Sequence, residues 1–342
     1  MTYATNTTID ALAAELRRAR RVLVTTHQKP DGDALGSVLA VVRACAAVGV
    51  AAEGWVVDPC EGNLRSFEGA TPVTHVHPRK PELPADGFDL VAVVDTGAWT
   101  QLEVIAPWLR DRHERVIGLD HHARGDAVAA RRVVDVACGS CTALLARLVD
   151  AMGVELRAGA DARGRGSIAE ALYMGLATDT GWFRFPNARA REFALAARLL
   201  EAGVDKDSMY QQIEQSSRAE RVELQGRALS SLEMLSAGRI ALMRLTAADF
   251  DETGAMLEET SGIVNIPMEI AAVRASILVV EDRAAGVIKL SFRSKPADDS
   301  GAFIDVNELA ARFGGGGHVH AAGAKQQGSL DEVAARVRAS VS

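Results

Sequence analysis

The chain has 342 residues, of which 48% are hydrophobic and 24% are charged, and its formal net charge at pH 7 is −7. This length suits two domains better than one hydrophobic core, and the composition is that of a globular protein. The acidic balance disfavours a groove for long nucleic acid, because such grooves present a basic surface to the phosphates.

The apolar runs, the N-terminal segment and the cysteine count exclude further classes of protein. No apolar run approaches the roughly 20 residues that a membrane-spanning helix needs, and the polar segment 1–10 lacks the layout of a signal peptide. We therefore expect a cytoplasmic protein with no membrane partner. Four cysteines are too few for a disulfide framework in a chain of this size. Cys138 and Cys141 form a lone C-x-x-C pair, which we interpret as small buried residues at a helix start.

Strand-like apolar runs alternate with helical patterns in the first half of the chain. Strands are predicted at 21–26, 52–57, 89–95 and 115–120, and helices at 33–48 and 168–177. Such alternation predicts an α/β domain with a mostly parallel sheet covered by helices on both faces. In such sheets ligands bind outside the carboxyl ends of the strands, and polar clusters follow three of the predicted strands.

His27 opens the first of these clusters. Residues 27–37 read H-x-x-P-D-G-D-A-x-G-S, and the proline and glycine turn the chain between the predicted strand and helix. The turn lets the His27 imidazole converge with the carboxylates of Asp31 and Asp33. One aspartate at a helix start is commonly a cap. Capping does not account for a second aspartate two residues away together with a histidine.

Further donors follow later apolar segments. Asp95 ends one strand, and Asp120, His121 and His122 come at the end of the next. Adjacent histidines after a buried strand need partners, since buried polar groups must be satisfied. Asp179 follows the apolar helix and adds a further carboxylate.

These side chains offer nitrogen and oxygen donors without a thiolate, a set that suits Mn²⁺ or Mg²⁺. There are enough donors for two ions. The charge of two divalent cations also balances the four carboxylates at positions 31, 33, 95 and 179. Two ions about 3.5–4 Å apart suit in-line attack on phosphorus. The residues alone therefore predict a metal-dependent phosphoesterase.

The last third of the chain changes character. Residues 188–235 show a helical pattern without a strand signal, and the part from 204 is interpreted as a linker. Strands are then predicted at 239–245, 272–280 and 287–293, and helices at 248–261, 305–313 and 330–341. This pattern predicts a second, smaller α/β domain. A glycine run, Gly314 to Gly317, and His318 are placed in a loop between a helix and the last strand.

The ordered set of motifs resembles one family. H-x-x-P-D-G-D-A-x-G-S, V-D-T, D-H-H, T-D-T-G and G-G-G-G-H are typical of DHH/DHHA1 phosphoesterases. Length and layout are similar to the group of bifunctional oligoribonucleases and 3′-phosphoadenosine 5′-phosphate phosphatases, the nanoRNases. The resemblance implies a DHH catalytic domain at 1–203, a helical linker at 204–235 and a DHHA1 substrate-binding domain at 236–342.

The resemblance also implies roles for single residues. One ion is held by His27, Asp31 and Asp95, and the other by Asp33, Asp95, His121 and Asp179, so that Asp95 bridges both. His122 is expected to face the substrate phosphate, and Asp120 to orient the histidines. In the second domain the expected nucleotide contacts are Arg293, Gly315, Gly316, Gly317 and His318.

The implied reaction is hydrolysis by in-line attack of a metal-bridging hydroxide. Its substrates are oligoribonucleotides of two to five nucleotides, including linear dinucleotides, and 3′-phosphoadenosine 5′-phosphate. Two Mn²⁺ ions are the expected cofactor, with Mg²⁺ or Co²⁺ as substitutes. Short RNA or a nucleotide, and no long duplex, is the expected partner. The preferred substrate, cleavage polarity, native metal and oligomeric state stay open, a homodimer being one alternative.

Three other functions remain as alternatives. A manganese inorganic pyrophosphatase shares the N-terminal motifs but pairs them with a different second domain, against which the G-G-G-G-H run argues. A single-strand-specific exonuclease of the same superfamily is generally longer. A non-catalytic nucleotide-binding regulatory protein would be signalled by a lost ligand, and every ligand position is kept. The absent membrane segment excludes a membrane-tethered cyclic-dinucleotide phosphodiesterase.

Overall fold

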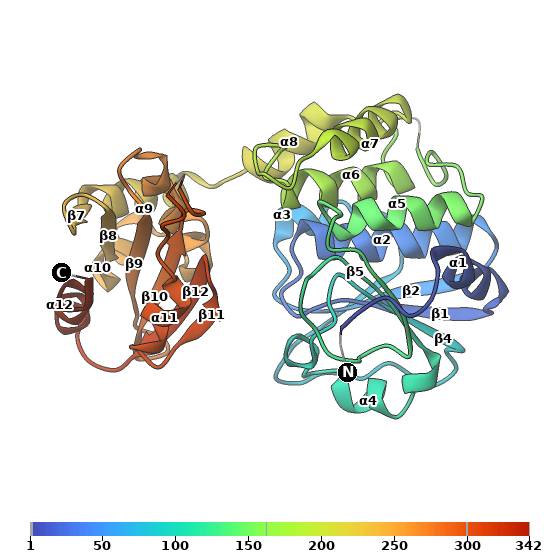
Figure 1. The fold of residues 1–342 in the computed structure, drawn as a ribbon, viewed down its shortest axis with the longest axis horizontal. Helices are drawn as coiled ribbons and strands as arrows, with labels where there is room; N and C mark the ends of the chain where they lie inside the picture. The colour runs from blue at the N-terminus through green and yellow to red at the C-terminus, as the bar shows by residue number, and fades with distance from the viewer. Residues whose placement is uncertain (1–2, 162, 299, 342) are drawn as a thin grey trace. The chain divides into compact units, whose positions relative to one another are not determined.

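A computed structural model describes residues 3–161, 163–298 and 300–341 of the protein. The chain divides into two compact units, Met1–Ser216 and Ser217–Ser342. This division falls inside the stretch 204–235 that the sequence analysis interpreted as a helical linker. Helix α8 (Lys206–Glu214) lies in the first unit and α9 (Ala219–Ser230) in the second. Each unit is a sheet with helices packed on it (Figure 1).

The first unit is built on a six-stranded sheet whose strand pairs are all parallel. The order is β3-β2-β1-β4-β5-β6, so β1, β4 and β5 are neighbours near the middle. The strands are β1 (Arg21–Thr25), β2 (Ala51–Val57), β3 (Val73–Val76), β4 (Leu90–Val94), β5 (Val116–Asp120) and β6 (Arg131–Val134). This arrangement confirms the predicted fold class.

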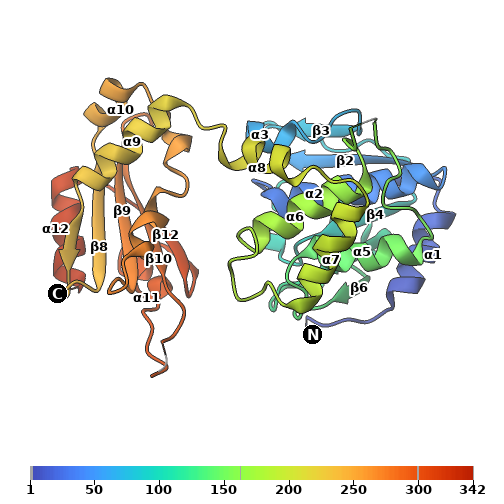
Figure 2. The same cartoon turned by 90° about the horizontal axis from the view of Figure 1, so that it is seen from above.

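Side chains alternate between two cores along the strands, as the two-residue period of a strand requires. Val22 and Val24 of β1 belong to the larger core with the helices, whereas Leu23 belongs to a second core on the opposite face. The larger core is covered by α1, α2, α5 and α6, which Figures 1 and 2 show on one side of the sheet. The helices of this unit are α1 (Ile9–Arg18), α2 (Gly32–Ala47), α3 (Gly62–Arg65), α4 (Ala106–Arg110), α5 (Cys141–Ala151), α6 (Ile168–Asp179), α7 (Ala190–Glu201) and α8.

Glycines allow α2 and α6 to pack closely. A Cβ on Gly36 of α2 would lie 2.5 Å from the Ala171 carbonyl oxygen of α6. A Cβ on Gly175 of α6 would lie 2.5 Å from Oδ1 of Asp33. Both positions therefore exclude any side chain, and this close packing brings the start of α2 beside the end of α6.

The second unit contains a mixed six-stranded sheet in the order β11-β12-β10-β9-β8-β7, in which β8 and β9 pair in parallel and the other neighbouring strands pair antiparallel. Apolar cores lie on both faces of this sheet as well. Its strands are β7 (Glu233–Leu235), β8 (Ile240–Leu245), β9 (Ala275–Asp282), β10 (Val287–Ser294), β11 (Gly316–His318) and β12 (Ala321–Gln326). Its α-helices are α9, α10 (Ala247–Thr253), α11 (Val306–Ala311) and α12 (Leu330–Val341).

Three predicted elements of the second unit were wrong in detail. Strand β7 lies where the pattern predicted only helix, because it pairs with β8 across a turn. The predicted helix 248–261 ends early, since Gly254 adopts a left-handed conformation with φ of 72° and caps α10. Part of the glycine run is strand β11 and not loop, because it pairs with β12.

Within the described residues, every helix is too short or too polar to span a bilayer.

Candidate metal centre

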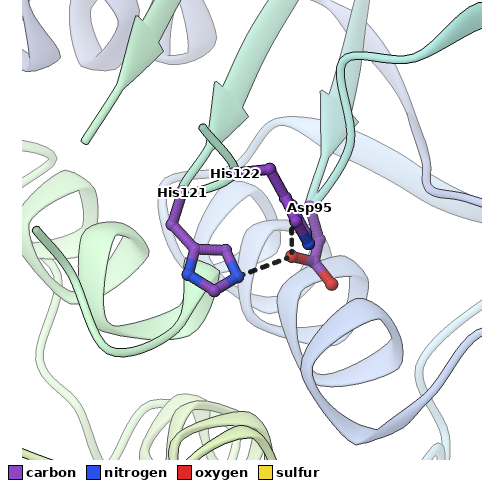
Figure 3. A group of neighbouring side chains, drawn as sticks. All are labelled: Asp95, His121 and His122. Atoms are coloured by element: carbon purple, nitrogen blue, oxygen red, sulfur yellow. Dashed lines mark ion pairs between the residues drawn. The ribbon is translucent and has the colours of Figure 1, made fainter. Parts of the chain in front are cut away.

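Polar side chains converge at the carboxyl ends of three neighbouring strands of the first unit. His27 follows β1, Asp95 follows β4 and His121 follows β5. Asp33 lies in the first turn of α2, and Asp179 is the last residue of α6. Asp95, His121 and His122 point toward one another in Figure 3. The structure therefore gathers these groups at the carboxyl ends of the strands, where the sequence predicted that ligands bind.

The donor atoms lie close together, but too far apart for hydrogen bonds. Nε2 of His27 lies 3.6 Å from Oδ2 of Asp95 and 4.0 Å from Oδ1 of Asp31. Nε2 of His121 lies 3.5 Å from Oδ1 of Asp95. It lies 3.8 Å from carboxylate oxygens of both Asp33 and Asp179. Among the described residues, three trios have ligand atoms that lie within 4.8 Å of one another: His27-Asp31-Asp95, Asp33-His121-Asp179 and Asp95-His121-His122.

The two imidazoles present the same nitrogen to this centre. Nδ1 of His27 lies 3.0 Å from the carbonyl oxygen of Gln28, and Nδ1 of His121 lies 3.4 Å from that of Cys138. A carbonyl accepts only, so in the neutral form of each imidazole Nδ1 carries the proton and Nε2 offers the lone pair. This is the orientation that a histidine needs to ligate a metal through Nε2.

Asp95 has an unusual backbone conformation and a carboxyl group with a strongly raised pKa. Its φ is 59°, a conformation that non-glycine residues rarely adopt and that recurs at functional sites. The side chain is 3% exposed, and its Oδ1 is buried without a hydrogen-bond partner. Burial raises the pKa of this carboxyl well above its usual range, and the charges of Asp33 and Asp31 raise it further. Such a group requires a positive partner to stay ionised.

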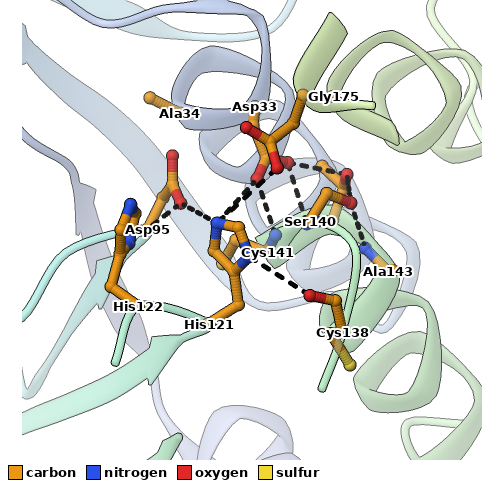
Figure 4. A network of polar contacts seen from close by, with 12 residues as sticks. Asp33, Ala34, Asp95, His121, His122, Cys138, Ser140, Cys141, Ala143 and Gly175 are labelled. Carbon is orange, nitrogen blue, oxygen red and sulfur yellow. Dashed lines mark hydrogen bonds and ion pairs between the residues drawn. The ribbon is translucent and has the colours of Figure 1, made fainter. Parts of the chain in front are cut away.

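Asp33 is held by the N-terminus of α5. Its Oδ1 accepts from the amide of Thr142 at 3.0 Å and from the Thr142 hydroxyl at 2.7 Å, and its Oδ2 accepts from the Cys141 amide at 2.6 Å. Figure 4 shows Asp33 between His121 and the start of this helix. Burial raises the pKa of Asp33, whereas the neighbouring His121 lowers it. These donors fix the carboxylate that faces His121.

Asp31 and Asp179 complete the set of carboxylates. Oδ1 of Asp31 caps α2 by accepting from the amides of Asp33 and Ala34, each at 3.0 Å. Asp31 is therefore a cap, as the simpler interpretation held, and it also lies beside His27. Burial, together with the charges of Asp33 and Asp31, raises the pKa of Asp179 to about 8.

His122 differs from its neighbour. Its Nδ1 lies 2.7 Å from Oδ1 of Asp120 but 3.9 Å from Oδ1 of Asp95, so the hydrogen bond is to Asp120. The side chain is half exposed, which leaves Nε2 available to a ligand from solvent. The bond with Asp120 raises the pKa of His122 against the effect of burial. Burial alone would raise the pKa of Asp120, but the hydrogen bond and charge of His122 hold it below its usual value.

The donor set fits a hard or borderline divalent cation. Several carboxylates share a small volume with no Lys or Arg paired to them in the described contacts. The nearby thiol is not a ligand, because Cys141 donates to the Leu119 carbonyl and burial raises its pKa well above normal. Oxygen and imidazole donors around uncompensated negative charge are the surroundings that Mn²⁺ or Mg²⁺ prefers.

The predicted substrate residues of the second unit have structural roles as well. Arg293 lies on β10, where burial lowers its pKa and one guanidinium nitrogen donates to the Phe292 carbonyl. The amide of Gly317 donates to Oδ1 of Asn307 at 2.8 Å, so this N–H is already used. Gly315 and Gly316 approach β12 and its neighbours with no room for a side chain at Gly315. The side chain of His318 lies outside the described residues.

The sequence analysis missed several residues that support the centre. Thr142 binds Asp33 by both its amide and its hydroxyl. Asn187 donates to the Asp179 carbonyl at 3.1 Å. The Tyr3 hydroxyl donates to Asp120. A helix start after Ser140 was a usable signal for Thr142, whereas the other two contacts span the fold and leave no mark in the local sequence.

Comparisons with known families place both units. Residues 21–176 match the model of the DHH family, N-terminal domain, and residues 242–342 match that of the DHHA1 domain. The bifunctional oligoribonuclease and PAP phosphatase NrnA of Thermus thermophilus is 30% identical over 334 residues, covering 95% of this chain and 91% of that protein. A probable NrnA of Streptococcus mutans is 26% identical and covers 93% of each chain.

Solved structures that resemble this chain match nearly its whole length. The crystal structure of an exopolyphosphatase-related protein from Bacteroides fragilis superposes with a TM-score of 0.84 at 26% identity, over 97% of this chain and 95% of that one. RecJ of Thermus thermophilus in complex with Mn²⁺ gives a TM-score of 0.51 at 18% identity, over 97% of this chain and 53% of that one. The likeness to RecJ concerns the fold alone.

Proposed function

Since the chain belongs to the DHH family of phosphoesterases, with a DHHA1 domain as its second unit, we propose that it is a two-metal hydrolase of short oligoribonucleotides. The proposed substrates have two to five nucleotides and include linear dinucleotides. We further propose that it removes a phosphate from 3′-phosphoadenosine 5′-phosphate. The names of the Thermus and Streptococcus relatives, which span almost the whole chain, support both substrate classes.

One observation carries the metal-dependent part of the proposal. Asp95 is buried, its Oδ1 has no hydrogen-bond partner, and both of its oxygens face imidazole Nε2 atoms at 3.5–3.6 Å. A buried carboxylate without a partner is costly unless a cation binds it. The other donors are His27 and Asp31, which form a trio with Asp95, and the separate trio of Asp33, His121 and Asp179.

The proposed ligand sets follow from these contacts. His27, Asp31 and Asp95 would hold one divalent cation, and Asp33, Asp95, His121 and Asp179 the other, with Asp95 shared. Bound divalent cations would lower the pKa of water and neutralise charge on a phosphate. The carbonyls of Gln28 and Cys138 keep both imidazoles in the ligating tautomer.

His122 is the proposed phosphate contact of the first unit. Asp120 holds Nδ1, so the half-exposed Nε2 is free to donate to a phosphate oxygen. Because the hydrogen bond to Asp120 raises the pKa of His122, the imidazole is protonated over a wider range near neutral pH. A protonated imidazole gives a stronger, charge-assisted hydrogen bond to an anion.

In the DHHA1 domain, Arg293, the three glycines Gly315, Gly316 and Gly317, and His318 are proposed to bind the nucleotide. Arg293 is partly buried and, in the described contacts, its guanidinium has no carboxylate partner. Such a guanidinium suits a phosphate, because its fork of donors matches two phosphate oxygens.

The test is a release assay on purified, chelated protein. A two-nucleotide RNA, a longer RNA, 3′-phosphoadenosine 5′-phosphate and inorganic pyrophosphate are compared side by side, with no metal and with added Mn²⁺, Mg²⁺ or Co²⁺. We expect turnover only with metal, best with Mn²⁺, and faster on the dinucleotide than on the longer RNA. Full activity after chelation would refute the metal requirement. Preference for the longer RNA would favour an exonuclease, and release from pyrophosphate alone would favour a pyrophosphatase.

A further inference from the structure

The segment that precedes α1 lies along the free edge of the first sheet. Asn6 donates its amide to the Arg132 carbonyl at 3.0 Å and accepts from the Arg132 amide at 2.7 Å. The Thr5 hydroxyl donates to the carbonyl of Val134 and accepts from its amide, each at 2.8 Å. Figure 2 shows the N-terminal segment beside β6. These bonds to β6, the last strand of the sheet, fix where Tyr3 lies.

Tyr3 fills a space that two glycines leave open. A Cβ on Gly97 would overlap the Tyr3 phenol, and a Cβ on Gly125 would lie 2.8 Å from carbons of the same ring. Gly97 is two residues after Asp95, and Gly125 is three residues after His122. The ring is therefore packed between the two loops that carry these site residues, at positions where any side chain would displace it.

The Tyr3 hydroxyl completes the hydrogen bonding of Asp120. Oδ1 of Asp120 accepts from the amides of His121 and His122, at 2.8 and 3.2 Å, and from Nδ1 of His122 at 2.7 Å. Oδ2 accepts from the Tyr3 hydroxyl. Asp120 is 1% exposed, so no water-facing oxygen remains to accept from solvent. Both carboxylate oxygens are therefore held by protein donors, three on Oδ1 and the Tyr3 hydroxyl on Oδ2.

We propose that Tyr3 is a positioning residue for His122: by holding Asp120, the phenol fixes the orientation of the imidazole that contacts the phosphate. This inference rests on the proposed function. Without the hydroxyl, Oδ2 of Asp120 is a buried acceptor with no partner, and the carboxylate gains freedom to rotate away from His122. The N-terminal segment, which precedes the matched DHH region, then has a role in turnover beyond covering the sheet edge.

The first test is Tyr3→Phe, which removes the hydroxyl and keeps the ring between Gly97 and Gly125. We expect kcat on the dinucleotide to fall by about 10-fold to 100-fold, the range typical of losing a partner one step behind the reacting groups. KM and metal content should stay near wild type, whereas Tm should fall by a few degrees because a buried acceptor loses its partner. Tyr210→Phe is the matched control, because Tyr210 is an exposed tyrosine of α8, and it should keep wild-type kinetics. A loss confined to KM, or wild-type kcat, would overturn the proposal.

A double-mutant cycle tests whether Tyr3 acts through Asp120. On an Asp120→Asn background, Tyr3→Phe should cost little further activity, because the partner it positions has already changed. An equal fractional loss on both backgrounds would mean that Tyr3 acts independently of Asp120, and the inference would be wrong. Gly125→Ala should reproduce the loss by displacing the ring, and it should have no further effect in Tyr3→Ala.

A readout without turnover separates this inference from the proposed function. In ¹⁵N-resolved NMR of the Mg²⁺-loaded protein, the Nδ1 proton of His122 should be protected from water in wild type and lost to exchange in Tyr3→Phe. If wild type hydrolyses none of the tested substrates, the proposed function fails while this signal still tests the positioning. An unchanged His122 signal in Tyr3→Phe overturns the positioning, whatever the activity.

Discussion

The metal centre of the first unit and the ion pairs of the second unit handle charge in opposite ways. In the second unit, acidic and basic side chains pair directly at the surface. Examples are Arg227–Glu252 at 2.9 Å, Arg244–Asp331 at 3.0 Å, Arg283–Asp251 at 2.8 Å and Arg338–Glu233 at 2.9 Å. In the centre, carboxylates of the same sign crowd together, and the imidazoles stay 3.5–4.0 Å away.

This difference separates charge that serves folding from charge that serves a ligand. An exposed pair is already satisfied, and its loss costs little. A buried carboxylate with an unpaired oxygen destabilises the protein until a cation binds it. The strained backbone of Asp95 and the raised pKa values of Asp33, Asp95 and Asp179 are features of charge that serves a ligand.

The largest expected effect follows from Asp95→Asn. The amide keeps the shape but removes the charge that both proposed cations share, so kcat should fall at least about 1000-fold, roughly 4 kcal/mol of transition-state stabilisation. The metal-free variant should be more stable than metal-free wild type near neutral pH, because folding no longer requires this carboxyl either to take up a proton or to be buried with its charge. Kinetics, metal analysis and thermal unfolding measure these effects. Asp111→Asn, at an exposed position, is the control. Near-normal turnover and metal content would exclude the bridging role.

Metal removal should make stability depend on pH in a defined direction. The folded, metal-free protein holds the proton of Asp179 up to a pKa of about 8, against 3.8 for an ordinary aspartate. Between these values the unfolded state binds fewer protons, so the stability of the metal-free protein falls as pH rises, by up to about 1.4 kcal/mol per pH unit. Added Mn²⁺ should therefore raise Tm more at pH 8 than at pH 5.

Asp179→Asn isolates this effect. The metal-free variant should show a flatter dependence of Tm on pH between about 4 and 8 than metal-free wild type, because the titrating carboxyl is absent. If the two proteins follow the same curve, the raised pKa of Asp179 is not the cause.

A smaller effect is expected in the second unit from Arg293→Ala and His318→Ala. Both variants should keep the metal-induced rise in Tm, because neither residue belongs to the metal centre. Arg293→Ala should lower kcat/KM on nucleotides by about 10-fold to 150-fold, the cost of roughly 1.5–3 kcal/mol for a charged hydrogen bond. The effect should be larger on the substrate with an extra terminal phosphate. Arg283→Ala, on the turn before the same strand, is the matched control.

The smallest effect should come from the Arg283–Asp251 pair itself. Both side chains are about two-thirds exposed, at 67% and 64%, so a double-mutant cycle should give a coupling of about 0.5 kcal/mol or less. Urea unfolding of the two single variants and the double variant measures this coupling. A coupling of several kcal/mol would show that surface pairs in this unit are not ordinary, and the contrast with the metal centre would weaken.

Much of the fold could be predicted because its signals are local. The apolar runs at β1, β4 and β5 and the turn after His27 identified the parallel sheet and its ligand-binding edge, and the motifs identified the donors that meet there. The short strands β3 and β6 were missed. Edge strands of four residues carry little apolar pattern, and pairing with a neighbour decides whether such a segment becomes a strand.

The sequence by itself determined which residue types could bind a cation and which ends of the elements carry them. Only the tertiary structure decided how each group is held. Gly36 and Gly175 let α2 approach α6, so Asp33 and Asp179 reach the same imidazole. Tyr3 reaches Asp120 across 117 positions of sequence. Such contacts depend on close packing between distant segments, and neither periodicity nor spacing along the chain records which distant surfaces will meet.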